Sequence, residues 1–341
     1  MSDFFKMSGS DTDIVISTRV RLARNLAGIP FGNRLASEDA ERLIAEVSRP
    51  IVENPVFSER FTLKKYGKEP SGELRGLVEK HLVSKEFAAS GLTRAALISE
   101  DGGISVMINE EDHIRLQAIG SGLCIEECLE AATSLDRVIE QGIGKELGGY
   151  AFDSRLGYLT CCPTNIGTGM RVSVMLHLPA LAASGSDRLL SRIASRFGLA
   201  VRGFYGEGTA ATGDIFQISN RVTLGYDESE LAQRLKEAVN SLIREERARR
   251  KEEYEASPLA FEDRVHRSAA VLSSARLIST DEAMQLLSDY RTGVASGILK
   301  GDMDRINALL WAIQPASLGG NSAASRDANR AELLRREINY E

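Results

Sequence analysis

Hydrophobic and polar residues alternate near the start of the chain with the period of two that half-buried strands show. A first strand is outlined by the apolar positions Ile14, Ile16, Val20 and Leu22. Residues 1–13, which precede it, are mostly polar or small. We expect them to form a flexible lead.

Three further strand-like runs follow at residues 95–98, 104–108 and 114–119, with Asp101-Gly102-Gly103 as a turn between the first two. Because so few residues separate these runs, they predict antiparallel hairpins rather than parallel strands joined by helices. Later apolar runs predict a strand leading into Cys162-Pro163 and strands at 172–178, 200–205 and 215–218.

Apolar residues recur at spacings of three and four in several longer segments, which predicts amphipathic helices. In the helix after Ser37, the buried face is formed by Leu43, Ile44 and Val47. The other segments with this period are 125–141, which ends at Gly142, 187–197 and 230–249.

Pro258 marks the start of a region in which every segment has a helical pattern. Within it, Ser279-Thr280-Asp281-Glu282 is a capping box that opens one helix. We therefore predict an α+β fold. An antiparallel sheet flanked by helices would span residues 14–253, and a small all-helical domain would span residues 254–341.

The composition limits the function further. The 341 residues carry a net charge of −6, which argues against non-specific nucleic-acid binding, since that usually needs a basic face. No apolar run approaches the ~18 residues of a membrane-spanning helix, and the N-terminus lacks the apolar core of a signal peptide. The cysteines follow no zinc-binding or paired spacing, so we expect no metal site and free thiols in a reducing cytoplasm. They are Cys124, Cys128, Cys161 and Cys162.

The most informative segment is residues 159–171, with the sequence LTCCPTNIGTGMR. Its glycine-punctuated loop brings backbone N–H groups, a thiol and the guanidinium of Arg171 to one sheet edge. This grouping suits an anionic ligand that meets a cationic substrate. The segment closely resembles the signature of the ATP:guanidino phosphotransferases, the family of arginine and creatine kinases. A match of this length is far more specific than a lone glycine motif.

Residues 109–115, with the sequence NEEDHIR, join two predicted strands. By composition alone such a run is more often a solvated loop, but its place at the end of an apolar strand favours a functional loop. The segment also matches the guanidino-kinase family. That resemblance implies that Glu111 holds and deprotonates the substrate guanidinium, a task that suits a carboxylate because it pairs bidentately with that group.

The resemblance implies two more catalytic groups. Glu207 is the second carboxylate that clamps the guanidinium, and Cys162 touches the guanidinium as a thiolate. From residue type alone, Cys162 is more often a small buried hydrophobic residue.

A cage of arginines is implied for the phosphates of ATP. Arg19 and Arg21 lie two apart on a strand and point to one face, although an isolated pair of this kind is usually a charged outer face. By resemblance they bind phosphate together with Arg115, Arg171 and Arg202. The ATP-binding residues implied in this way are Ser17, Thr18, Arg19, Val20, Arg21, His81, Arg115, Arg171, Val172, Ser173, Val174, Met175, Arg202, Gly203, Phe204, Tyr205, Gly206 and Glu207. Mg²⁺ is expected to be held mainly through the phosphates and water. Neither a P-loop sequence nor an H-R-D loop is present in the chain.

The helical region after Pro258 points to one branch of the family. Small-molecule kinases carry an extra N-terminal helical domain, which we expect to be absent because the first strand begins near Asp13. The arrangement resembles the bacterial protein-arginine kinases of the McsB type. Residues 326–331, with the sequence RDANRA, fit that group's R-D-x-x-R-A motif, which is associated with a phosphoarginine pocket.

The pocket implied by the motif consists of Arg326, Asp327, Arg330 and Ala331. The two arginines lie four apart on one helical face, which suits a phosphate. The alternative is an exposed, charged helix. Asp327 either receives the bound guanidinium or orients one of the arginines.

The sequence therefore predicts an ATP-dependent kinase that phosphorylates arginine side chains of proteins. The resemblance implies that it tags proteins for a Clp-type unfoldase, controls a heat-shock repressor and works with a zinc-binding activator protein in the cytoplasm. A homodimer is a candidate assembly, and no direct nucleic-acid or membrane partner is expected. Two alternatives stay open: a phosphagen kinase acting on free arginine, and a phosphoarginine-reading adaptor with a weak kinase site.

Overall fold

The computed structural model describes residues 7, 9–67, 72–144, 147–183, 187–203 and 212–338. The chain divides into two compact units. Unit 1 comprises residues 1–9, 18–173 and 219–236, and unit 2 comprises residues 10–17, 174–218 and 237–341.

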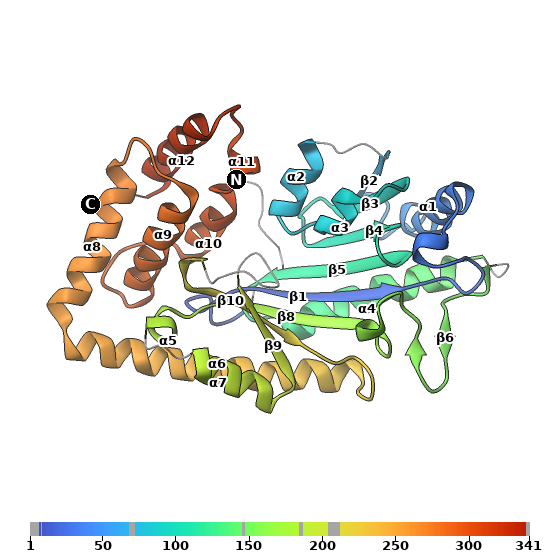
Figure 1. The fold of residues 1–341 in the computed structure, drawn as a ribbon, viewed down its shortest axis with the longest axis horizontal. Coiled ribbons are helices and arrows are strands. Elements are labelled where there is room, and N and C mark those ends of the chain that lie inside the picture. The colour runs from blue at the N-terminus through green and yellow to red at the C-terminus, as the bar shows by residue number, and fades with distance from the viewer. Residues whose placement is uncertain are drawn as a thin grey trace. The chain divides into compact units, whose positions relative to one another are not determined.

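Eight strands form a sheet in the order β2-β3-β4-β5-β1-β8-β10-β9 (Figure 1). Their bounds are β1 Val15–Arg24, β2 Phe61–Tyr66, β3 Arg94–Ser99, β4 Ile104–Ile108, β5 Ile114–Ser121, β8 Met170–His177, β9 Leu199–Gly203 and β10 Ile215–Asn220. Strands β2 to β5 pair antiparallel, with Ala96 opposite Met107 and Met107 opposite Arg115. The predicted hairpins are confirmed, because the turn at residues 101–103 joins β3 to β4 and Asp101 Oδ1 accepts a hydrogen bond from the N–H of Gly103 at 3.0 Å.

Helices pack on the strands of unit 1. Helix α1 (Ser37–Val52) contacts β3 and β4, helix α4 (Ile125–Gly142) contacts β5, and the two helices contact each other. Both helices begin as predicted, and α1 buries the predicted face of Leu43, Ile44 and Val47.

A second core lies beside this one and was not predicted. Helices α2 (Gly72–Glu79) and α3 (Lys85–Ala89) pack Leu74 and Phe87 with Ala96 and Met107. The segments that build it are short and mostly polar, so their periodicity is weak, and only packing on the sheet reveals their buried positions.

The predicted strand leading into Cys162-Pro163 is wrong. Residues 159–162 have no regular structure, and a small hairpin of β6 (Phe152–Asp153) and β7 (Gly157–Tyr158) precedes them. The backbone N–H of Leu159 donates to the carbonyl of Ala151 at 2.9 Å instead of to a neighbouring strand. Pro163, which has no N–H to give to a sheet, begins the 3-10 turn η3 (Pro163–Asn165).

Every helix or strand described after Ser257 is a helix, as predicted. The helices of unit 2 are α5 (Pro179–Ala183), α6 (Asp187–Arg196), α7 (Glu228–Ala256, whose first residues belong to unit 1), α8 (Pro258–Ser274), α9 (Thr280–Ala295), α10 (Met303–Ala312), α11 (Pro315–Leu318) and α12 (Ala323–Glu337). Helix α7 continues past the predicted end at residue 249. Pairs four residues apart, such as Arg249 with Glu245 at 2.8 Å, support it where the apolar pattern stops.

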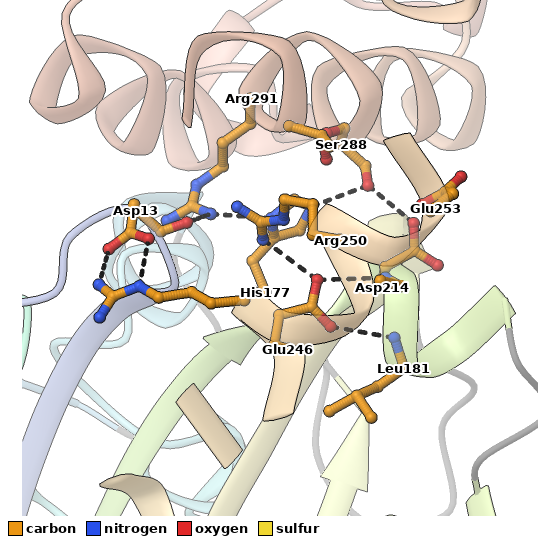
Figure 2. A network of polar contacts seen from close by, with 12 residues as sticks. Asp13, His177, Leu181, Asp214, Glu246, Arg250, Glu253, Ser288 and Arg291 are labelled. Carbon is orange, nitrogen blue, oxygen red and sulfur yellow. Dashed lines mark hydrogen bonds and ion pairs between the residues drawn. The ribbon is translucent and has the colours of Figure 1, made fainter. Parts of the chain in front are cut away.

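A buried polar network lies within unit 2 (Figure 2). Nη1 of Arg291 on α9 donates to Nδ1 of His177 at 2.8 Å, so the ring proton resides on Nε2, which donates to Ser288 Oγ at 2.8 Å. The Ser288 hydroxyl in turn donates to Asp214 Oδ2 at 2.7 Å. Burial and the charge of Arg291 hold the pKa of His177 well below its usual value, so the ring is neutral. The network joins α9 to the end of β8 and to the turn η4 (Thr212–Asp214).

Candidate active site

The neighbouring strands β5, β1 and β8 (Figure 1) carry four arginines of unit 1. Arg19 and Arg21 point to one face of β1, Arg115 lies on β5, and Arg171 lies at the start of β8. The charges of Arg115 and Arg171 act on both Arg19 and Arg21. The four guanidinium groups therefore share one region above the middle strand β1.

These arginines repel one another. Burial, followed by the charges of Arg115 and Arg171, lowers the pKa of Arg19 to about 9, and burial and its arginine neighbours hold the pKa of Arg21 well below its usual value. Both groups keep their protons at neutral pH. The Nε atoms of Arg19 and Arg21 are buried and have no hydrogen-bond partner among the residues that the structure describes. Crowded positive charge with unused buried donors fits an anion that carries many acceptor oxygens.

Glu110 supplies a counter-charge to this cluster. Its side chain is 1% exposed and accepts hydrogen bonds from Arg115 Nη1 and Ser84 Oγ, each at 2.5 Å. Burial alone would raise the pKa of Glu110, but the charge of Arg115 and these hydrogen bonds outweigh burial and lower it. Glu110 is therefore ionised and committed to holding Arg115.

Glu111, the next residue, is exposed. Partial burial, followed by the charges of Asp112 and Glu110, raises the pKa of Glu111, although Arg115 opposes the shift. An accessible carboxylate with a raised pKa binds a proton more strongly than an ordinary glutamate does. It is suited to accept a proton from a cationic group that docks beside it.

Residues 109–113, between β4 and β5, form the acidic loop. Residues 159–167, the cysteine loop, lie next to it in unit 1. The backbone N–H of Cys161 donates to Asp112 Oδ1 at 2.7 Å. Burial, followed by the charge of Asp112, raises the pKa of the Cys161 thiol to about 12, so Cys161 stays protonated. Cys162 is half-buried, and its Sγ lies 3.1 Å from Thr164 Oγ1.

Thr223 holds the remainder of this loop. Its hydroxyl bonds to the carbonyl oxygens of Thr164 and Ile166 at 2.9 and 2.6 Å. At Gly167, where φ is 115°, a Cβ atom would lie 2.3 Å from the Thr223 carbonyl oxygen. Only glycine fits this approach, which explains why the loop is rich in glycine.

The residues around Arg19 divide between two faces of β1. Thr18 and Val20 are fully buried on the face opposite the arginines, and the Thr18 hydroxyl donates to the Gly122 carbonyl at 2.7 Å. Their side chains therefore belong to the core, whereas the arginines point to the other face of the strand. His81 lies near Arg19 and Arg21, and burial, followed by their charges, lowers its pKa to about 3, so its ring is neutral.

The other predicted ATP-binding residues are distributed as follows. Val172 and Ser173 are buried on β8 in unit 1. Ser17, Val174, Met175, Arg202 and Gly203 belong to unit 2. Phe204, Tyr205, Gly206 and the predicted catalytic residue Glu207 lie outside the described residues.

The predicted phosphoarginine pocket lies in unit 2. Arg330 is 1% exposed, and it donates to the carbonyl oxygens of Ile313 and Ile278 at 2.9 and 2.8 Å and to Asp327 Oδ1 at 2.7 Å. The alternative of an exposed, charged helix is therefore wrong for Arg330. Asp327 orients Arg330, Arg326 is half-buried, and Ala331 is buried.

Two features bear on cofactors and location. Across the described ranges, no three His, Cys, Asp or Glu side chains are grouped in a way that holds a metal ion. Among the same residues, no helix is long and apolar enough to cross a membrane.

Sequence reasoning missed Ser84 and gave no role to Glu110, which Ser84 and Arg115 bind. Ser84 also caps helix α3 by accepting a hydrogen bond from the Phe87 N–H at 2.9 Å. A serine before a short helix signals the cap, but no local pattern signals its second bond to Glu110. That bond depends on a residue 26 positions away.

Comparisons with known proteins identify the family of the chain. The model of the ATP:guanido phosphotransferase C-terminal catalytic domain matches residues 46–249, and that of the protein-arginine kinase McsB C-terminal domain matches residues 258–341. The protein-arginine kinase of Caldanaerobacter subterraneus subsp. tengcongensis is 42% identical over 335 residues, covering 96% of this chain and 98% of the relative. That of Symbiobacterium thermophilum is 43% identical over 345 residues, covering 99% and 96%.

Solved structures show the same fold. Lombricine kinase matches with a TM-score of 0.62 at 25% identity, covering 72% of this chain and 69% of that one. The duplicated taurocyamine kinase from Schistosoma mansoni, solved with transition-state-analogue components, has the same TM-score and identity, and this chain spans 35% of its length. The chain therefore belongs to the ATP:guanido phosphotransferase family, within its protein-arginine kinases.

Proposed function

We propose that the arginine cluster of unit 1 binds the phosphates of ATP, and that the acidic and cysteine loops present a protein arginine to it. The observation that carries this proposal is the pair of buried, unpartnered Nε atoms on Arg19 and Arg21 beside Arg115 and Arg171. Such donors cost free energy until an acceptor arrives. A polyphosphate supplies the acceptors and relieves the repulsion among the arginines.

When bound, ATP with Mg²⁺ supplies the phosphoryl group that is transferred. Arg19, Arg21, Arg115 and Arg171 are the described residues of unit 1 that would hold its phosphates, and Arg202 of unit 2 is assigned to the same role. Mg²⁺ would be held mainly through the phosphates and water. Forked guanidinium groups stabilise charge on a transferring phosphoryl group better than point charges do.

Glu111 is the proposed proton acceptor. Its exposed carboxylate can pair with the substrate guanidinium, and its raised pKa favours taking up the proton that the attacking nitrogen releases. Cys162 is assigned to contact the guanidinium from the neighbouring loop, and Glu207 is assigned as the second carboxylate. Positioning of this kind supplies much of the catalysis of phosphoryl transfer.

The wider roles follow from the same family membership. We propose a catalytic domain at residues 14–253 and a regulatory helical domain at residues 254–341, supported by family matches that end at 249 and begin at 258. Arg326, Asp327, Arg330 and Ala331 are proposed to form a phosphoarginine pocket. We also propose that the chain phosphorylates protein substrates in the cytoplasm and forms a homodimer. Its proposed partners are a zinc-binding activator, a Clp-type unfoldase and a heat-shock repressor that it controls.

The test is to incubate the purified chain with Mg-ATP and an unfolded protein, and to search for acid-labile phosphoarginine by mass spectrometry. We expect phosphoarginine with the wild type and, with Glu111→Gln, formation that is slower by about 10²-fold or more. Free arginine, offered in parallel, is expected to be a poor substrate. Preferred transfer to free arginine would indicate a phosphagen kinase, and phosphoarginine binding without ATP turnover would indicate an adaptor.

A further inference from the structure

Asp112 lies between the acidic loop and the cysteine loop of unit 1. Its Oδ1 atom accepts hydrogen bonds from the backbone N–H of Cys161 and from Nδ2 of Asn25, both at 2.7 Å. Asp112 is 3% exposed. Glu111 immediately precedes Asp112, and Cys162 immediately follows Cys161. The two bonds therefore form a short link between the backbone that carries Glu111 and the backbone that carries Cys162.

Asn25, at the end of β1, completes this link. Its Oδ1 accepts from the backbone N–H of His113 at 2.9 Å, and its Nδ2 also donates to the Leu159 carbonyl at 3.1 Å. Both donors and the carbonyl of the amide are thus in use, which leaves the side chain a single orientation. Asn25 is 1% exposed, so water does not compete for these bonds.

The His113 ring fixes the base of the acidic loop. The Leu26 N–H donates to Nδ1 at 3.0 Å, so Nε2 carries the proton and donates to the Pro30 carbonyl at 3.0 Å. Burial lowers the pKa of His113, which keeps the ring in this neutral form. The loop is therefore held on one side by the segment after β1 and on the other by the cysteine loop.

The partners of Asp112 are unusual for a buried carboxylate. No arginine or lysine of the described chain forms an ion pair with it, and its hydrogen bonds come from the neutral N–H groups of Asn25 and Cys161. A buried carboxylate without a cation is costly unless its hydrogen bonds compensate. Asp112 lies in the acidic loop, and one of its hydrogen bonds comes from the cysteine loop. The free energy of the buried carboxylate therefore depends on the distance between the two loops.

We infer that Asp112 and Asn25 are positioning residues that set the distance between the Glu111 carboxylate and the Cys162 thiol, and hence the placement of the substrate guanidinium between them. This inference rests on the proposed roles of Glu111 and Cys162. A displacement of about 1 Å in such a site can lower the rate about 10²-fold. None of the described hydrogen bonds of Asp112 or Asn25 goes to an arginine of the cluster, so loss of the link lowers kcat without weakening ATP binding.

The experiment compares Asp112→Ala, Asp112→Asn and Asn25→Ala with the wild type. Asp112→Ala removes the acceptor oxygen, whereas Asp112→Asn keeps an acceptor oxygen and removes only the charge. Asp101→Ala is the matched control, because Asp101 Oδ1 also accepts two bonds, from Ser99 Oγ at 2.6 Å and from the Gly103 N–H at 3.0 Å, but in the turn between β3 and β4. For each variant, kcat and KM for phosphoarginine formation in an unfolded protein, the Kd of a fluorescent ATP analogue and the thermal midpoint are measured.

We expect kcat of Asp112→Ala to fall about 10- to 100-fold with the Kd of the ATP analogue within about twofold of the wild type. The kcat of Asn25→Ala should also fall, and this variant provides the test if Asp112→Ala does not fold. Asp112→Asn should keep kcat within about threefold on the alkaline side of the acid limb, and Asp101→Ala should keep it within about twofold.

Three results would overturn the inference. The first is a kcat of Asp112→Ala or Asn25→Ala equal to that of Asp101→Ala. The second is an equal loss of kcat in Asp112→Asn and Asp112→Ala, and the third is a loss of ATP affinity that accompanies the loss of kcat. Failure of the proposed function looks different. It would appear as a wild type that forms no phosphoarginine, or as a Glu111→Gln variant that retains wild-type turnover.

Discussion

The carboxylates of Glu110 and Glu111 are adjacent in the sequence and lie in opposite environments. The Glu110 side chain is 1% exposed and binds Arg115 Nη1 at 2.5 Å, whereas Glu111 is exposed. The same contrast separates their pKa shifts, because Arg115 lowers the pKa of Glu110, whereas burial and its acidic neighbours raise the pKa of Glu111. One carboxylate therefore shapes the arginine cluster, and the other remains available to a substrate.

Replacing Glu111 with Gln should remove the proton acceptor while keeping the size of the side chain. We expect the rate of transfer to arginine to fall by about 10²–10⁴, with ATP affinity nearly unchanged, because Glu111 does not hold the arginine cluster. Steady-state kinetics and nucleotide binding measure the two effects. Glu100→Gln, an exposed glutamate in the turn after β3, is the control. Wild-type turnover in Glu111→Gln would assign the base to another residue.

Arg21→Lys should impair the enzyme even though the charge is conserved. A lysine ammonium cannot reproduce the planar fork of a guanidinium, and the buried Nε donor of Arg21 is lost. We expect kcat/KM for ATP to fall more than about tenfold, which corresponds to about 1.4 kcal/mol or more. Arg42→Lys on the exposed side of α1 is the matched control. Unchanged kinetics in Arg21→Lys would place this residue outside the phosphate site.

The pH dependence of transfer should follow Glu111. The ionised carboxylate accepts the proton, so the rate falls as the pH drops through the pKa of Glu111. Because this pKa is raised, the acid limb lies at a higher pH than it would for an unperturbed glutamate. Asp112→Asn removes one of the like charges that raise it and should move the limb to lower pH. The measurement is kcat against pH for both proteins, and coincident limbs would mean that another group controls the limb.

Variants of Arg326 and Arg330 on helix α12 should have different effects, one on phosphoarginine binding and the other on the free energy of unfolding. Arg330→Ala leaves Asp327 and two carbonyl oxygens without a buried donor, so we expect a loss of about 2 kcal/mol or more in the free energy of unfolding. Arg326→Ala should change the free energy of unfolding by less than about 0.5 kcal/mol. If the pocket binds phosphoarginine, Arg326→Ala should weaken it by about 1.5–3 kcal/mol. Calorimetry with free phosphoarginine and urea unfolding check the two parts, and equal affinity in Arg326→Ala and wild type would exclude Arg326 from a pocket.

Local pattern determined much of the architecture. The strand-like run at Ile104–Ile108, the turn at residues 101–103 and the helices predicted near Ser37 and Ile125 agree with the structure. These features depend on side-chain periodicity and turn chemistry within a few residues, which the chain order contains directly. The spacing of Arg19 and Arg21 likewise predicts a shared face, because the period of a strand is two.

Only the tertiary structure decided which of two adjacent glutamates is buried, and that Arg330 is buried rather than part of an exposed face. Each outcome depends on partners far along the chain: Ser84 for Glu110, and Ile278 and Ile313 for Arg330. The link from Asp112 to Asn25, 87 residues away, is of the same kind. Burial and hydrogen-bond partners are properties of the packed chain. Residue type and family resemblance therefore predicted candidate groups, and packing determined the environment of each described group.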